Sequence, residues 1–258
     1  MMNKRPAHNQ IRLWAVAFWL LVWQIAAMAL DALYPQGHLL LPTPLSALVR
    51  LGELAWTVDF WMSIGQSFLR IVGGFLISCL AASLLAVPAS RWKWVRELLS
   101  PLVATVKAVP VASFIILALV WLSSKSLAMF ISALMVFPPV YLNVLEGIRQ
   151  TDKKLLEMAK VFRVPLWRQV RGIYLPQVLP YFRTAVSLAL GLCWKAGIAA
   201  EVIGLPTGSL GEHLYNAKVY YMTPDLFAWT AVIVMVSAVF ERAFLRVIDA
   251  LVGKAGAK

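Results

Sequence analysis

The sequence predicts an all-α protein that crosses a membrane six times, and three observations lead to this prediction. Of its 258 residues, 61% are hydrophobic and only 14% are charged, with a mean hydropathy of +0.76. One water-soluble core cannot bury that much apolar surface. The apolar residues form runs near the roughly 20 residues that a helix needs to cross a bilayer. Lysines and arginines collect in alternate connections between these runs.

The expected spans cover residues 12–33, 64–88, 108–123, 126–146, 178–203 and 225–247. The third is short and contains Pro110, so where it begins is left open. The first follows a polar, basic stretch, Met1–Gln10, and no small-residue cleavage pattern comes after it, so we expect it to be retained. No low-complexity linker divides the chain, which indicates one transmembrane domain over residues 1–258.

The charge distribution predicts the orientation. Basic residues precede the first span, lie between the second and third and between the fourth and fifth, and follow the sixth. The opposite connections hold only Arg50, Lys125 and Lys218, together with several acidic residues. Because lysine and arginine are enriched on the cytoplasmic side, both termini are expected in the cytoplasm.

The first outer connection begins with Leu41-Pro42-Thr43-Pro44, whose two prolines exclude a helix interior. The stretch that follows, Leu45–Trp56, alternates apolar and polar residues at helical spacing. It predicts an amphipathic helix lying along the outer surface.

The connection between the fourth and fifth spans, about residues 150–177, predicts two short helices at an angle. Apolar residues recur at helical spacing over 155–162, with lysines and a glutamate on the other faces. Asp152, or Thr151 before it, can cap the start, and Pro165 should end the helix. A second helix is expected over Pro165–Gly172. By composition alone, this could also be an ordinary basic loop without a further role.

The residue order in this loop resembles the EAA loop of binding-protein-dependent ABC importer permeases. That pattern is Glu-Ala-Ala, three residues, Gly, nine residues, Ile, one residue and Leu-Pro. This chain keeps the spacing, with Glu157, Met158 and Ala159 at the start, and Ile173, Leu175 and Pro176 at the end. It departs at Met158 and at Arg163, which stands where the family has the glycine. Glycine suits a tight turn, so Arg163 leaves the turn's backbone open, and Pro165 could supply the break instead.

Other segments resemble the nitrate, sulfonate, taurine and bicarbonate branch of that family. They are Leu41-Pro42-Thr43-Pro44, Ser67-Phe68-Leu69-Arg70 with Gly73-Gly74-Phe75, and Ala199-Ala200-Glu201 with Gly204.

The resemblance implies a permease subunit of the bacterial inner membrane whose loop docks on a separate ATPase. The coupling residues carried over are Glu157, Met158, Ala159, Arg163, Val164, Pro165, Leu166, Ile173, Leu175 and Pro176. It also implies two ATPase copies and an extracytoplasmic binding protein. Since such pores are normally built from two permease subunits and one chain offers six spans, a homodimer of the permease is expected. The sequence has no Gly-x-x-x-x-Gly-Lys-Ser/Thr phosphate loop, so ATP and Mg²⁺ are expected on the partner and no cofactor on this chain.

Charged residues at the expected spans are candidates for the translocation path. Lys195 and Glu201 are six residues apart and cannot pair along one regular helix. Lys195 could instead extend its long stem to the outer interface. For Glu201, we favour a structural role at the outer mouth, holding the segment Thr207–Leu214 or the binding protein. For Arg70, we favour a snorkelling or inter-span contact over a substrate ligand.

Other function classes find little support. Basic residues between apolar runs do not form the exposed basic domain of a nucleic-acid binder. His38 and His213 stand apart from any second metal ligand, and Gly208–Gly211 predicts a turn and helix start, so neither a metal site nor a catalytic residue is expected. Cys79 and Cys193 lie in apolar segments as packing residues. The main alternative, a self-contained secondary transporter, should show an internal repeat, and none is visible.

Overall fold

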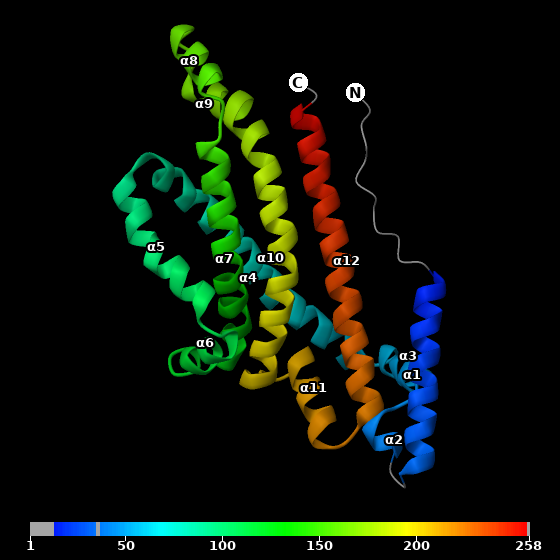
Figure 1. The fold of residues 1–258 in the computed structure, drawn as a ribbon. Helices are drawn as coiled ribbons and strands as arrows, with labels where there is room; N and C mark the ends of the chain where they lie inside the picture. Colours follow the sequence, from blue (N-terminus) through cyan, green and yellow to red (C-terminus); the bar gives the residue numbers. More distant parts are fainter. Residues whose placement is uncertain (1–12, 35–36, 257–258) are drawn as a thin grey trace. The chain divides into compact units, whose positions relative to one another are not determined.

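The computed structural model describes residues 13–34 and 37–256, and every regular element within them is helical (Figure 1). In order, these are α1 (Leu13–Leu33), α2 (Gly37–Leu40), α3 (Pro44–Ala55), α4 (Val58–Arg91), α5 (Lys93–Ala108), α6 (Val111–Ala118), α7 (Ser124–Arg149), α8 (Lys153–Val161), α9 (Leu166–Gln169), the π-helix η1 (Val170–Tyr174), α10 (Leu175–Gly204), α11 (Leu210–Val219) and α12 (Thr223–Gly256).

The chain forms two compact units. The first holds the chain up to Phe60 together with His213–Ala231, and the second holds Trp61–Glu212 together with the chain from Val232. Three helices, α4, α11 and α12, contain residues of both units, and each unit is described by itself.

In the first unit, the predicted amphipathic helix is confirmed as α3. The Thr43 hydroxyl caps it by accepting the backbone N–H of Ser46 at 3.2 Å, and Pro44 occupies its first position. The Arg50 guanidinium of α3 reaches the first turn of α12, where it donates from Nε and Nη2 to the Asp225 carboxylate at 2.6 and 3.1 Å. These bonds and the nearby Glu53 raise the pKa of Arg50.

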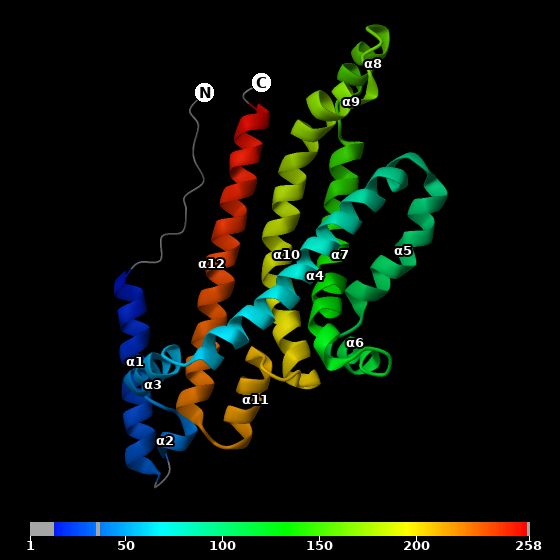
Figure 2. The ribbon, with the colours of Figure 1, turned by 180° about the vertical axis from the view of Figure 1, so that it is seen from behind.

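In the second unit, α7 and α10 run side by side in both views, and α4 packs across them (Figures 1 and 2). The helices approach closely at two glycines. A Cβ atom on Gly74 of α4 would lie 2.2 Å from the Met129 carbonyl oxygen of α7, and one on Gly197 of α10 would lie 2.6 Å from Ile71 of α4. Small residues at contacts are typical of helices packed within membranes.

Buried hydroxyls join the same helices. The Ser78 hydroxyl of α4 donates to the Ala133 carbonyl of α7 at 2.7 Å, and the Ser132 hydroxyl of α7 donates to the Cys193 carbonyl of α10 at 3.2 Å. Beside them, α6, α7 and α10 share an apolar core that includes Ile115, Leu127 and Ile131. These contacts join the start of α7 to the end of α10, on the side away from the loop that connects the two helices.

Four described helices are long and apolar enough to cross a membrane: Trp14–Leu33, Val58–Arg91, Ser124–Arg149 and the continuous run Leu166–Gly204. The third predicted span, 108–123, is wrong as a single crossing. Its helical part, α6, has eight residues, and α5 and α6 meet the criterion only as a pair bent by 107°. α12 covers the sixth predicted span, 225–247, and Asp225 is the one charged residue in the stretch 223–240 at its start. The described helices therefore give four spans, or five with the bent pair, against the predicted six.

Candidate functional site

The first candidate site is the loop between α7 and α10, which starts as predicted. The Asp152 side chain caps α8 by accepting the Lys154 backbone N–H at 2.8 Å. The Asp152 backbone N–H donates to the Gln177 side-chain oxygen of α10 at 2.9 Å. The loop is therefore fastened to the two helices that it connects.

The turn after α8 answers the question raised by Arg163. Arg163 has φ +49°, the left-handed conformation that glycine adopts without strain. Its backbone N–H donates to Lys160 at 3.1 Å, and the next N–H, that of Val164, donates to Ala159 at 2.8 Å. These two bonds are the usual left-handed cap of a helix C-terminus. The turn thus keeps the geometry that a glycine would favour, although arginine occupies it.

The second predicted helix, Pro165–Gly172, is wrong in its extent. α9 covers only Leu166–Gln169, with Pro165 as its N-cap, and it continues through η1 into α10. The bend in the loop therefore lies between α8 and α9, and everything after Pro165 forms one helical run with the span.

The loop exposes a set of large apolar side chains, which we call the loop patch: Met158, Val161, Phe162, Leu166 and Trp167. Phe162 and Trp167 are 73% and 72% exposed. Basic residues surround them in the sequence. Exposed apolar patches with a polar rim mark interaction surfaces.

The remaining predicted coupling residues differ in burial. Ala159 is 1% exposed, so its side chain supports the loop from within. Glu157 is exposed and makes no hydrogen bond or ion pair with another described residue. Arg163, Pro165 and Leu175 are exposed, and Val164, Ile173 and Pro176 are partly buried.

The second candidate site is a buried polar cluster around Glu201, near the end of α10. The Glu201 side chain is fully buried, and its Oε2 atom accepts the Ser67 hydroxyl at 2.7 Å and the Gly211 backbone N–H at 3.2 Å. The Ser67 hydroxyl in turn accepts the Leu210 backbone N–H at 2.9 Å. The carboxylate and the serine from α4 therefore hold the first N–H groups of α11, which have no partner within that helix.

A tight reversal brings α11 back to Glu201. α10 ends at Gly204, its C-cap Leu205 has φ +48°, and Gly208 has φ +69°. The Ser209 hydroxyl accepts the Glu212 backbone N–H at 3.1 Å, and the Glu212 carboxylate accepts the Gly208 N–H at 2.6 Å. The predicted turn and helix start at Gly208–Gly211 are confirmed, since α11 begins at Leu210.

Arg70 supplies the positive charge of this cluster. Its Nη1 atom lies 3.5 Å from Glu201 Oε1, and its side chain is 14% exposed. That contact lacks hydrogen-bond geometry, while Nη2 donates to the Gln66 side chain at 3.1 Å. Arg70, Ser67 and Glu201 thus form one inter-helix network.

The comparisons with known proteins agree with this architecture. A sequence profile for binding-protein-dependent transport system inner membrane components matches residues 45–254. This chain belongs to that family. The matched region includes the loop and the Glu201 cluster, so both are parts of a transport permease subunit rather than of an enzyme.

Individual relatives fall in the branch indicated by the sequence. The permease is 26% identical over 229 residues to the aliphatic sulfonates transport permease SsuC of Bacillus subtilis strain 168, covering 88% of this chain and 81% of that one. It is 30% identical over 209 residues to SsuC of Escherichia coli strain K12, covering 78% and 75%. It is 25% identical over 184 residues to the bicarbonate transport permease CmpB of Synechococcus elongatus, covering 71% and 66%.

Lys195 of the permease lies apart from the Glu201 cluster. It is exposed on α10 and makes no ion pair or hydrogen bond within the described part of the chain. The cysteines, Cys79 and Cys193, are buried and not joined in a disulfide. Residues 13–34 and 37–256 contain no group of three or more metal-ligating side chains.

Sequence reasoning gave no role to Ser67 and Gly211, which the structure joins to Glu201. A signal was present for Ser67, since it lies three residues before Arg70 and therefore on the same helix face. The need for glycine at 211 follows only from the folded turn, because a Cβ there would lie 2.3 Å from Glu201 Cβ.

Proposed function

We propose that this permease is the membrane-spanning subunit of an ATP-driven importer and that the α8–α9 loop is its coupling element. Two copies would form the translocation path in a bacterial inner membrane, each with an ATPase subunit on the cytoplasmic side. A binding protein would deliver a small solute to the opposite face. Both termini would lie in the cytoplasm, and ATP and Mg²⁺ would bind only to the ATPase.

The loop patch carries this proposal. Phe162 and Trp167 are exposed, one on each side of the bend at Pro165, on a loop that is hydrogen-bonded to α10 through Asp152 and Gln177. A surface of this kind needs a partner to remove it from water. Because α9 continues through η1 into α10, a partner that moves the loop would also move a candidate span.

Within this proposal, Lys195 faces the translocation path, while Glu201 and Arg70 hold the path's outer end. Lys195 stands exposed on a helix long and apolar enough to span the membrane. A charge in that position is costly against lipid and is usually placed on a protein-lined or water-filled route. A second permease copy facing α10 would provide such a route.

The test is co-purification followed by reconstitution. The affinity-tagged permease should retain an ATPase subunit that carries a phosphate loop, in a ratio of one ATPase per permease. Phe162→Glu and Glu157→Lys should each reduce the retained ATPase at least tenfold while leaving membrane insertion unchanged. Lys153→Gln, an exposed change on the same helix, should retain it. Uptake into vesicles in the absence of any ATPase would instead identify a secondary transporter and overturn the proposal.

A further inference from the structure

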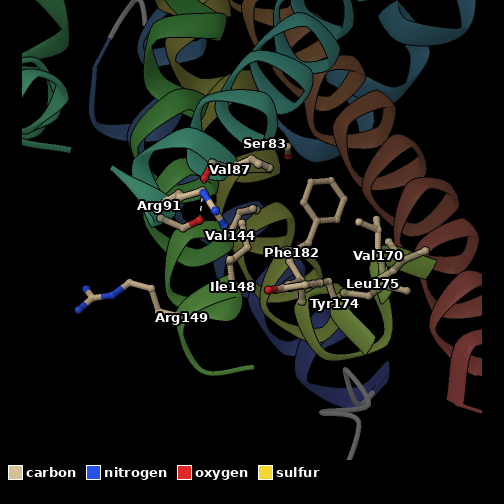
Figure 3. Close-up of a pocket in the computed structure, with 13 residues that line it drawn as sticks. Ser83, Val87, Arg91, Val144, Ile148, Arg149, Val170, Tyr174, Leu175 and Phe182 are labelled. Carbon is tan, nitrogen blue, oxygen red and sulfur yellow. Dashed lines mark hydrogen bonds between the residues drawn. The ribbon is translucent and has the colours of Figure 1, made fainter. Parts of the chain in front are cut away.

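A cavity of about 680 Å³ opens where α4 and α7 end and α10 begins, on the same side as the loop (Figure 3). Pockets for small ligands measure about 300–1,000 Å³, so this one can hold a single small molecule or part of a larger one. All of its lining residues belong to the second unit.

The cavity wall is mostly apolar. Val87 comes from α4, Val144 and Ile148 from α7, and Val178 and Phe182 from α10. Among the residues that line it there is no aspartate or glutamate. A wall of this composition favours hydrocarbon over water, because water in the cavity would find few hydrogen-bond partners.

Two arginines stand at the helix ends beside this wall. Arg91 is the last residue of α4 and Arg149 the last of α7, and both line the cavity. In Figure 3, Arg91 lies near Val87 and Val144, whereas Arg149 extends outward from the end of its helix. Neither side chain makes an ion pair or hydrogen bond with another described residue. Arg183, the residue after Phe182, is different because it pairs with Asp249.

The π-helix forms part of the same wall. Val170 and Tyr174, the first and last residues of η1, both line the cavity. π-helical turns are rare in proteins, and those that occur are often found at functional sites. The Tyr174 ring adds apolar surface and a hydroxyl that can donate to an anion. A ligand here would touch α7 just before the loop and η1 just after it.

We propose that the cavity binds one anionic phospholipid, with an acyl chain against Val144, Val178 and Phe182 and the phosphate at the helix ends that carry Arg91 and Arg149. The apolar wall is complementary to the acyl chains of such a lipid. The two unpaired arginines, with no carboxylate among the lining residues, are complementary to its phosphate. Basic pockets between membrane helices bind anionic headgroups in this way. That the lipid comes from the cytoplasmic leaflet rests on the orientation given in the proposed function, but the binding itself does not.

The experiment uses the full-length permease, purified in a neutral detergent and titrated with three probes. These are dioleoylphosphatidylglycerol, dioleoylphosphatidylcholine with the same acyl chains, and sodium phosphate. Only the phosphatidylglycerol should raise the thermal midpoint in a saturable manner, and native mass spectrometry should show one lipid retained per chain.

Variants separate the two halves of the site. The double variant Arg91→Gln with Arg149→Gln should weaken phosphatidylglycerol binding at least tenfold. Val170→Trp, which places a ring at the cavity rim, should do the same without removing a charge. Lys93→Gln is the matched control, because Lys93 is a nearby exposed cation whose contact is the surface pair with Glu97 at 3.5 Å. It should bind like the parent.

Three outcomes would overturn the proposal. Equal stabilisation by phosphatidylcholine would show that the arginines do not select an anionic headgroup. Equal stabilisation by phosphate alone would make the cavity a site for soluble anions. Unchanged lipid binding in both the arginine double variant and Val170→Trp would place the lipid elsewhere. None of these measurements needs an ATPase, so the lipid site can fail while the importer assignment stands.

Discussion

The Glu201 carboxylate accepts the backbone N–H of Gly211 at 3.2 Å, so an acidic side chain near the end of α10 caps the helix that follows the turn. The same oxygen accepts the Ser67 hydroxyl, and Arg70 lies beside the other oxygen. Three helices therefore meet at one buried charge. Such a network is costly to break from one side, because the remaining partners stay buried without compensation.

Glu201→Gln should destabilise the permease strongly. The amide keeps an acceptor for Ser67 and Gly211 but leaves Arg70 without its counter-charge, which typically costs about 3–5 kcal/mol for a buried pair. The thermal midpoint of the purified chain should fall by several degrees. Glu97→Gln, which removes an exposed carboxylate paired with Lys93, should leave it nearly unchanged.

Adding Arg70→Met to Glu201→Gln should recover part of the lost stability. In the double variant no buried charge is left unpaired, so its midpoint should lie above that of Glu201→Gln alone. Strictly additive losses would mean that the 3.5 Å contact between Arg70 and Glu201 carries no coupling.

Gly211→Ala should disrupt the same turn by steric contact. A Cβ at 211 would lie 2.3 Å from Glu201 Cβ and 2.5 Å from the Glu201 carbonyl carbon, and a backbone atom cannot move aside cheaply. The variant should unfold at a lower temperature and lose transport. Gly191→Ala in α10 is the matched control, since a Cβ at 191 would have no neighbour within 4 Å and alanine gains about 0.5–1 kcal/mol over glycine in a helix. Equal effects of the two changes would rule out the steric explanation.

Arg163→Gly should stabilise the loop. Arg163 holds φ +49°, which costs a non-glycine residue about 1 kcal/mol, and glycine relieves that cost. Amide hydrogen exchange over α8 and α9 should slow in this variant. Arg163→Val should have the opposite effect, because a β-branched residue is least tolerant of a positive φ. If Arg163→Gly instead speeds exchange, the arginine side chain makes a contribution that outweighs the strain.

The sequence was sufficient for features that depend on local pattern. The amphipathic α3, the Asp152 cap and the helix start after Gly208 all follow from a few neighbouring residues. The bend between α5 and α6 was not predictable from hydropathy, because α5 carries Lys93, Arg96, Glu97 and Lys107 and resembles a connection. The partners of Glu201 were also out of reach, since Ser67 lies 134 residues away and only helix packing brings the two together.

Lys195 is exposed on α10, and its side chain makes no hydrogen bond or ion pair with another described residue. If it lines the translocation path, Lys195→Met should slow uptake of an anionic cargo at least tenfold, and Lys195→Arg should restore most of the rate. The thermal midpoint and the retained ATPase should not change, because the side chain makes no hydrogen bond or ion pair within the described chain. If the lysine only extends to the membrane interface, both variants should transport like the parent.

Lys125→Met, which removes another exposed lysine near the start of α7, gives the baseline for losing a positive charge. Measuring the KM and the maximal rate separately decides the role, since a cargo contact made only during passage lowers the rate without changing the KM.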